Sequence, residues 1–284
     1  MFPDLSPPDR RARPRSRFTP VADALFHALR TSASRVNTLR TALGIVIVAG
    51  AAIAVLGTWA FAELAEHVRE GATQPFDEAV LRRLDAIHAP WLDEVMLEVT
   101  ALGNGTVVLA LALVSATFLW LNRHRYSAAL LGGATAGALL LNILLKSYFD
   151  RPRPQVVSWG THVSTSSFPS GHATSAIVVY ATIAYLVARL QQRRLSRIVT
   201  LTLAGIVILA IAASRLVLGV HYPSDVAAGL VIGLAWAAFC MALLEAAARL
   251  VRRDRSGEAQ HEAPTPQQRE EDAADRRTAD ARSA

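Results

Sequence analysis

The chain has 284 residues, 52% of them hydrophobic, and a mean hydropathy of +0.30. Several apolar stretches reach the ~20 residues that a helix needs to cross a bilayer, so composition predicts an integral membrane protein. The net charge of +6 comes from arginines beside apolar stretches rather than along a soluble basic face, which argues against a nucleic-acid partner. The single cysteine, Cys240, excludes an intrachain disulfide and a Cys-based metal site.

The chain opens with a basic arm, residues 1–40, which is rich in Pro and Arg and predicts a cytoplasmic segment with one interfacial helix. Residues 41–64 are too long for a signal-peptide core and predict a retained first span. Five further spans are predicted at 105–122, 127–149, 172–190, 198–218 and 225–250. The predicted fold is therefore all-α, a polytopic six-transmembrane-helix bundle over 41–250. Residues 251–284 are charged, lack apolar periodicity and predict a disordered cytoplasmic tail.

The segment between the first two spans, HAPWLDEVMLEVTALGNG, has the pattern of an amphipathic helix. Its apolar residues fall on one helical stripe, away from its acidic residues: Trp91, Leu92, Val95, Met96 and Val99. We expect this helix to lie along the outer membrane interface.

Arginine placement predicts the orientation, because cytoplasmic loops carry the excess of positive charge. Arginines gather before the first span, between spans two and three, between spans four and five, and after the sixth. Both termini are therefore predicted to be cytoplasmic. Lys146, Arg151, Arg153 and Arg215 stand at span ends on the opposite, extracytoplasmic side. The rule disfavours that position, so several cations there need another reason.

The first polar cluster is LLKSYFDRPRP, which holds the only lysine of the chain, Lys146. An ammonium and a guanidinium bind anions differently, so this lysine is a candidate anion ligand, although chance placement explains a single residue equally well. The prolines stop the third helix and favour extended backbone. Alternate side chains of an extended segment point opposite ways, so only one of Arg151 and Arg153 faces a given site.

The second cluster is FPSGHATS, which leads directly into the fourth span. Ser170 is a candidate N-cap, and a helix start after Ser-Gly presents free N–H groups and a positive dipole end to an anion. His172 then lies in the first turn beside that anion. Ordinary helix capping is the simpler interpretation of this stretch taken alone.

The third cluster, SRLVLGVHYPSD, joins the fifth and sixth spans. Arg215 ends one helix, and His221 precedes Asp225 by four residues, so a helix starting at Pro223 brings the carboxylate toward the imidazole. Asp225 could then keep one ring nitrogen protonated and leave the other free to attack. A capping aspartate beside an interfacial histidine is the alternative.

Together the clusters supply the groups that phosphate chemistry uses. The cations are Lys146, Arg153 and Arg215, and two histidines and a carboxylate accompany them. A phosphate ester carries roughly −1.5 to −2 charges near neutral pH. Its transfer is catalysed mainly by positioning and charge stabilisation, with histidines as nucleophile and general acid.

These clusters resemble the signatures of the type 2 phosphatidic acid phosphatase family, KxxxxxxRP, PSGH and SRxxxxxHxxxD, in order and without a substitution. The spacing selects Arg153 rather than Arg151. The resemblance implies six spans and an outward-facing site without a metal or other cofactor. It also implies that His221 forms a phosphohistidine, that Asp225 orients it, and that His172 protonates the leaving oxygen and then helps activate water. The implied phosphate-binding residues are Lys146, Arg153, Ser170, Gly171 and Arg215.

The predicted function is hydrolysis of a lipid phosphate by a multi-pass enzyme of the cell membrane, with membrane lipids as its surroundings. A polyprenyl diphosphate in a bacterial membrane is the favoured substrate, and phosphatidate, phosphatidylglycerol phosphate and a lipid A phosphate stay open. A lipid phosphotransferase and a non-catalytic carrier of anionic lipid are alternatives. A metal hydrolase using His162, His172, His221 and Asp225 is another, although that spacing matches no common metal motif.

Overall fold

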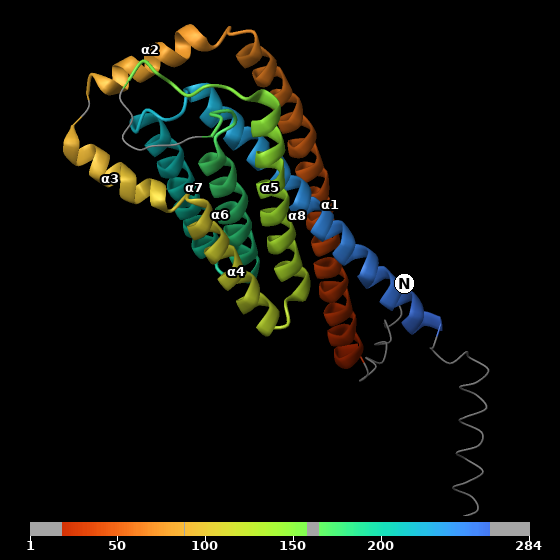
Figure 1. Ribbon diagram of the computed structural model, residues 1–284. Coiled ribbons are helices and arrows are strands. Elements are labelled where there is room, and N and C mark those ends of the chain that lie inside the picture. The colour runs from red at the N-terminus through yellow and green to blue at the C-terminus, as the bar shows by residue number, and fades with distance from the viewer. Residues whose placement is uncertain (1–18, 88, 158–164, 262–284) are drawn as a thin grey trace, which may run out of the picture. The chain divides into compact units, whose positions relative to one another are not determined.

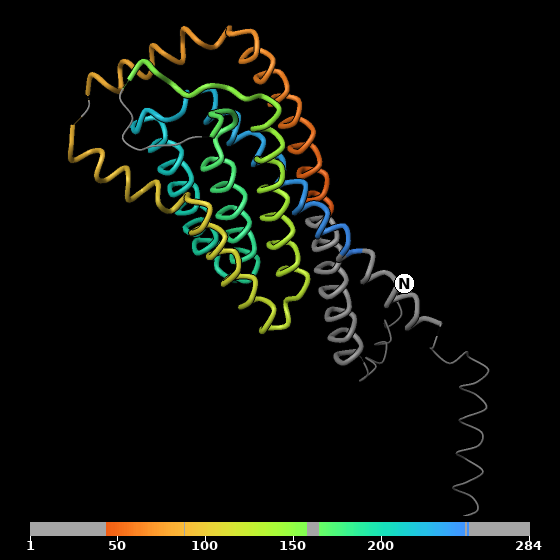
Figure 2. Tube along the Cα trace, viewed as in Figure 1, coloured from red at the N-terminus to blue at the C-terminus, as the bar shows by residue number. Residues whose placement is uncertain are grey.

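The computed structural model describes residues 19–87, 89–157 and 165–261, with side chains described at 44–87, 89–157, 165–247 and 249 (Figure 2). It divides into two compact units, Met1–Ile45 and Val46–Ala284. The second unit carries the features that follow. Within the described residues all regular secondary structure is helical, which confirms the all-α prediction.

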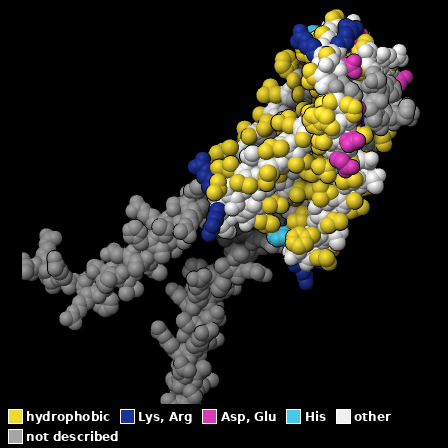
Figure 3. Space-filling view, turned by 90° about the vertical axis from the view of Figure 1, so that its left-hand side faces the viewer, with side chains coloured by type: hydrophobic (Ala, Val, Ile, Leu, Met, Phe, Trp, Pro, Cys, Tyr) yellow, Lys and Arg dark blue, Asp and Glu magenta, His cyan; other side chains and the backbone are white. Residues whose placement is uncertain are grey.

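Among the described residues six helical stretches are long and apolar enough to cross a membrane, so the predicted six-span bundle is confirmed. They are Gly44–Arg69 of α1 (Thr19–Arg69), α3 with α4 (Pro90–Ala101 and Gly105–Leu121), α5 (Arg125–Phe149), α6 (Gly171–Leu190), α7 (Arg194–Val217) and Pro223–Ala247 of α8 (Pro223–His261). Apolar side chains cover the surface between two ends where Lys and Arg gather (Figure 3). The helix of α8 continues to His261, past residue 250 where the predicted span ends, and residues 262–284 lie outside the described part.

Two short helices lie between the first and second predicted spans. α2 (Gln74–Asp85) runs across the end of the bundle, where it packs against α7 and α8 (Figure 1). It buries Leu81 and Asp77. α3 covers the segment predicted to lie on the membrane surface and packs against α7, and its Trp91 stays exposed. Its composition also suits the first part of a longer span, and the surface location remains a prediction.

Small residues let α8 lie close against α6 at the centre of the bundle. A Cβ at Gly229 would come 2.6 Å from the Ser170 carbonyl oxygen, and one at Gly233 would clash with Ile177. Neither position therefore has room for a side chain. The close approach brings the start of α8 to the start of α6, where the Ser170 N–H donates to the Asp225 carbonyl at 3.0 Å.

The helices α5 to α8 alternate in direction along the chain, so four helix ends lie together at one end of the bundle. We call this the site end. The last turns of α5 and α7 meet the first turns of α6 and α8 there (Figure 1). Each of the three polar clusters occupies one of these helix ends or the loop beside it. Segments more than seventy residues apart in the chain thus become neighbours.

Candidate active site

The first cluster places two cations side by side. α5 ends at Phe149, and Asp150 adopts a left-handed conformation with φ of 39° before the extended Arg-Pro pairs. The Lys146 ammonium donates to the Ser166 carbonyl at 2.6 Å, and the Arg153 Nε donates to the Thr165 carbonyl at 2.8 Å. Both cations are therefore bound by neutral oxygens of the segment before α6, and this segment does not offset their positive charges.

The second cluster forms the start of α6 but differs from the prediction at Ser170. Ser170 is the N-cap residue, yet its hydroxyl is buried without a hydrogen-bond partner. Its N–H donates to the Asp225 carbonyl, so that amide is not free to bind phosphate as predicted. Gly171 and His172 open the helix, and N–H groups in a first turn have no intrahelical acceptor. The amides left free to bind an anion are therefore those of the first turn.

The third cluster orients the candidate nucleophile. Gly219 has a φ of 68°, a conformation that suits glycine, and the chain turns there from α7 into the His221 segment. His221 is 2% exposed, with Nδ1 3.4 Å from Oδ2 of Asp225 and Nε2 3.3 Å from the Arg153 guanidinium. The proton of a neutral ring then belongs on Nδ1, facing the carboxylate, so the Nε2 lone pair faces Arg153.

Burial sets the protonation of this histidine. It lowers the pKa of His221 to about 4, although the Asp225 carboxylate acts in the opposite direction. The ring is therefore neutral at physiological pH, as a nucleophile must be. Burial also lowers the pKa of the Arg153 guanidinium, and Asp225 partly offsets the effect.

A cavity of about 300 Å³ opens between these groups. It brings together most of the predicted site residues, namely Lys146, Arg153, Gly171, His172, Arg215 and His221. Ser170 and Asp225 are fully buried and do not line it. Three cations thus face one cavity, and within the described residues none of them has a salt bridge. An anion is the ligand that such a cavity favours.

Behind the cavity lies an ion network that sequence reasoning missed. Arg151 lies between two buried carboxylates, 3.0 Å from Asp77 and 2.6 Å from Asp225. Asp77 is 0% exposed and also accepts hydrogen bonds from the N–H and hydroxyl of Ser224, at the start of α8. Nothing in the spacing of Asp77 points to this role, because α2 meets α8 only through the tertiary fold.

Other residues in or beside the cavity were also missed. Thr100 of α3 accepts a hydrogen bond from Arg215 at 2.7 Å, and Gly103 lies against His172 where a Cβ would come 3.1 Å from the ring. Asn142 and Ser175 line the cavity from α5 and α6. Each stands one turn from a motif residue, which is the sequence signal that could have found them.

A metal site was the alternative use of these histidines. His162 lies outside the described residues, and among those described no three His, Cys, Asp or Glu side chains gather as a metal-ligand group. Metal independence itself stays a prediction.

Comparison with known proteins places this geometry in a family. Residues 127–249 match the model of the PAP2 superfamily. The chain is 34% identical over 175 residues to "Phosphatidylglycerophosphatase B" of Bacillus subtilis (strain 168), covering 61% of this chain and 86% of that protein. A crystal structure described as the first transmembrane PAP2 type phosphatidylglycerolphosphate phosphatase from Bacillus subtilis aligns with a TM-score of 0.62 and 32% identity, over 66% of this chain and 93% of that one.

A third relative is "Decaprenylphosphoryl-5-phosphoribose phosphatase" of Mycobacterium tuberculosis (strain CDC 1551 / Oshkosh), 37% identical over 128 residues, 44% of this chain and 64% of that protein. The family match spans all three polar clusters, and the structural neighbour is a transmembrane protein. With its six spans and its cation-lined cavity, the chain belongs to the PAP2 superfamily of membrane phosphatases.

Proposed function

We propose that this protein hydrolyses a phosphate ester of a membrane lipid at the extracytoplasmic face through a phosphohistidine intermediate. One observation carries the proposal. The unprotonated Nε2 of His221 lies beside Arg153 in a cavity lined by cations, and the Asp225 carboxylate lies next to Nδ1 on the other side of the ring. A phosphoryl group held by the cations would place phosphorus within reach of that nitrogen.

The first step transfers the phosphoryl group to the enzyme. The Nε2 lone pair forms the P–N bond as the bond between phosphorus and the lipid oxygen breaks, and His172 gives its proton to that oxygen. A bound phosphate favours the protonated form of His172, because an opposite charge stabilises the imidazolium. Asp225 stabilises the positive charge that develops on the His221 ring.

The second step releases phosphate. Water gives a proton to the now neutral His172 while its oxygen attacks phosphorus, and the P–N bond breaks and returns its electron pair to Nε2. Throughout, Lys146, Arg153 and Arg215 offset the phosphoryl charge, assisted by the amides of Gly171 and His172.

The extracytoplasmic location follows from arginine placement in the sequence, with both termini cytoplasmic. Six spans of alternating direction put Lys146, His172, Arg215 and His221 at one end of the bundle, which is compatible with a single membrane face. Attaching an impermeant maleimide to a cysteine at exposed Ser147 in intact cells would test the face, because labelling requires an external thiol.

The test of the mechanism is the variant His221→Ala. We expect phosphate release from lipid phosphates in detergent to fall by a factor of about 10⁴ or more, since removing a nucleophile of a catalytic triad costs that much or more. The matched control is His124→Ala, because His124 is exposed at the other end of α5. Acid quenching with ³²P-labelled lipid should trap label on wild-type protein only. Full activity of His221→Ala would refute the mechanism.

The identity of the acceptor separates hydrolysis from phosphate transfer to another lipid. We expect the label to appear as inorganic phosphate, and label in a second lipid would support the phosphotransferase alternative. The same assay run in EDTA tests the proposed metal independence, because loss of activity restored by zinc would favour the metal hydrolase.

A further inference from the structure

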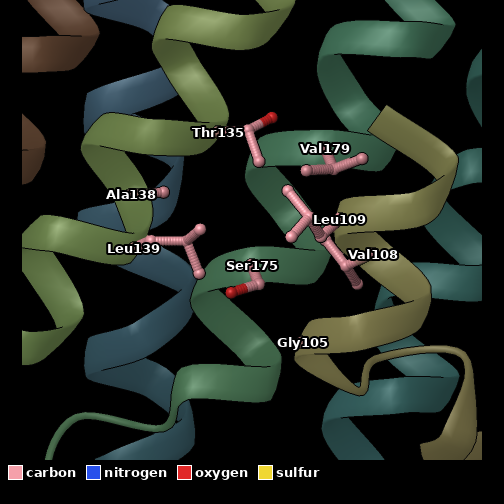
Figure 4. A pocket seen from close by; sticks show the side chains of 8 residues that line it. All are labelled: Gly105, Val108, Leu109, Thr135, Ala138, Leu139, Ser175 and Val179. Atoms are coloured by element: carbon pink, nitrogen blue, oxygen red, sulfur yellow. The ribbon is translucent and has the colours of Figure 1, made fainter. Parts of the chain in front are cut away.

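The candidate nucleophile faces cations on the side of the cavity. Arg153 and Arg215 line that cavity together with the His221 ring, and none of its lining residues is acidic. Farther into the bundle, α4, α5 and α6 leave only a pocket of about 10 Å³, and its lining carries no charged side chain (Figure 4). The negative charge that the structure gives this ring lies on its other side, beneath α2.

Behind the ring, charges alternate along three side chains, Asp225, Arg151 and Asp77. One oxygen of Asp225 lies 3.4 Å from Nδ1 of His221, and its other oxygen accepts from Nη1 of Arg151 at 2.6 Å. Nη2 of Arg151 donates to Asp77 at 3.0 Å. Because two carboxylates share one guanidinium, the three side chains together carry a net charge of −1. We call these three side chains the charge chain.

The tertiary fold holds Asp77 firmly at the far end of the charge chain. Asp77 is 0% exposed on α2 and accepts hydrogen bonds from the N–H and the hydroxyl of Ser224. Gln74 of the same helix accepts from Arg151 and donates to the Tyr222 hydroxyl. Burying carboxylates in excess of their cations costs free energy, and an uncharged side chain would join α2 to α8 at a lower cost. The retained charge therefore points to a use beyond packing.

The negative charge has a use when the phosphoryl group is transferred. The phosphate of a substrate offsets the cations of the cavity, but formation of the P–N bond leaves a positive charge on the His221 ring, which is still protonated at Nδ1. Arg151 and Asp225 alone would form a neutral ion pair behind the ring and would offset little of that charge. Asp77 neutralises the guanidinium and so leaves the charge of Asp225 for the ring.

We propose that Asp77 is a positioning residue for phosphoryl transfer, which acts through Arg151 to hold Asp225 in place and to keep its negative charge available to His221. This role rests on the proposed function and extends it to a residue outside 127–249, the part of the chain that matches the family. Asp77 does not line the cavity, so it should affect the rate of the reaction rather than the binding of substrate.

The variant Asp77→Asn tests the charge, because an amide has nearly the same shape and still accepts from the Ser224 N–H. The substrate is the lipid that wild type hydrolyses fastest in detergent among phosphatidate, phosphatidylglycerol phosphate and farnesyl diphosphate. We expect kcat to fall about tenfold to a hundredfold while KM stays within about twofold of wild type, since one unit charge is lost one ion pair away from the ring. Formation of the ³²P-labelled phosphoenzyme, measured by rapid acid quenching, should slow by a similar factor.

A second substitution, Arg151→Gln, separates charge from structure. The double variant Asp77→Asn with Arg151→Gln again has a net charge of −1 behind the ring, carried by Asp225 alone. Its kcat should exceed that of Asp77→Asn by about threefold or more, although both ion pairs are lost. If Asp77 only stabilised the fold, the double variant would have the lower kcat of the two. That result, or a wild-type kcat in Asp77→Asn, would overturn the inference while the hydrolase stands.

The matched control is Glu245→Gln, which lies near the opposite end of the span formed by α8. Glu245 is 1% exposed and pairs with Arg189, so this change also replaces a buried, paired carboxylate by an amide. It should lower the unfolding temperature about as much as Asp77→Asn does and leave kcat unchanged. Equal losses of kcat in the two variants would overturn the inference. Release of phosphate from none of the three lipids by wild type would overturn the proposed function as well.

Discussion

Arg151 and Arg153 are two residues apart in one extended segment, and the site end uses them in opposite ways. Arg151 points behind the cavity and pairs with two buried carboxylates, Asp77 and Asp225. Arg153 points into the cavity, where its described hydrogen-bond partners are carbonyl and hydroxyl oxygens and the His221 ring. The alternation expected of an extended chain separates them.

The difference separates a cation whose charge is neutralised by carboxylates from one proposed to bind the substrate. Arg151 has its charge compensated inside the protein and stacks over the Tyr222 ring at 4.2 Å, so it holds the start of α8 in place. Arg153 shares a cavity with two other cations and lacks a described carboxylate partner. Its charge is available for a substrate, and the mutual repulsion of the cations is a cost that a bound phosphate relieves.

Replacing Arg151 should give the largest effect on stability. Arg151→Ala leaves Asp77 and Asp225 buried without their counter-ion, and breaking a buried pair costs about 3–5 kcal/mol. The measurement is unfolding of the detergent-solubilised protein by heat or denaturant. If Arg151→Ala and Arg153→Ala lowered the stability of the protein equally, the proposed difference between the two arginines would be wrong.

Arg153→Ala should lower kcat/KM by about 10²–10³, as removal of a transition-state donor does. Its unfolding temperature should not fall, because the variant also removes repulsion from Lys146 and Arg215. Arg153→Lys should restore activity only in part, since an ammonium lacks the planar fork of donors. Parallel losses of stability and activity in Arg153→Ala would contradict the functional role.

The buried histidine beside Arg153 should make stability depend on pH. Burial lowers the pKa of His221 to about 4 in the folded protein, against an ordinary value of 6.5. The unfolded chain therefore binds the proton more readily, so His221 stabilises the fold fully above pH 6.5 and less as the pH falls toward 4. Between pH 7 and 4.5 the unfolding temperature of wild type should fall further than that of His221→Ala. Equal slopes would show that this histidine is not protected from protonation.

Thr100 should give the smallest effect, because it acts through Arg215. Thr100→Val removes the oxygen that accepts from the Arg215 guanidinium and should lower kcat/KM about threefold to tenfold. Inhibition by inorganic phosphate should weaken by a similar factor, which a purely structural role would not cause. Thr100→Ser keeps the oxygen and should restore both, and a failure of that rescue would count against positioning by Thr100.

Much of the fold was predictable because long apolar runs have few stable arrangements in a membrane. Five of the predicted spans agree with the helical ones to within about five residues at each end, and the second begins at 105 where the apolar helical stretch begins at Pro90. The cavity collects six of the eight predicted site residues. Asp225 lies behind His221, where an orienting carboxylate was predicted. Ser170 differs from the prediction because its N–H donates to the Asp225 carbonyl, a contact between α6 and α8 that no local pattern reports.

The amino-acid sequence alone determined the number of spans, the chemistry of the three clusters and the alternation of Arg151 with Arg153, because hydropathy, residue type and backbone period are local properties. Only the tertiary structure decided that Arg151 pairs with Asp77 and that the Ser170 amide is not free. It also decided that Asn142 and Ser175 line one cavity. Those outcomes depend on contacts between helices far apart in the chain, and small residues such as Gly229 and Gly233 set the distances between the helices.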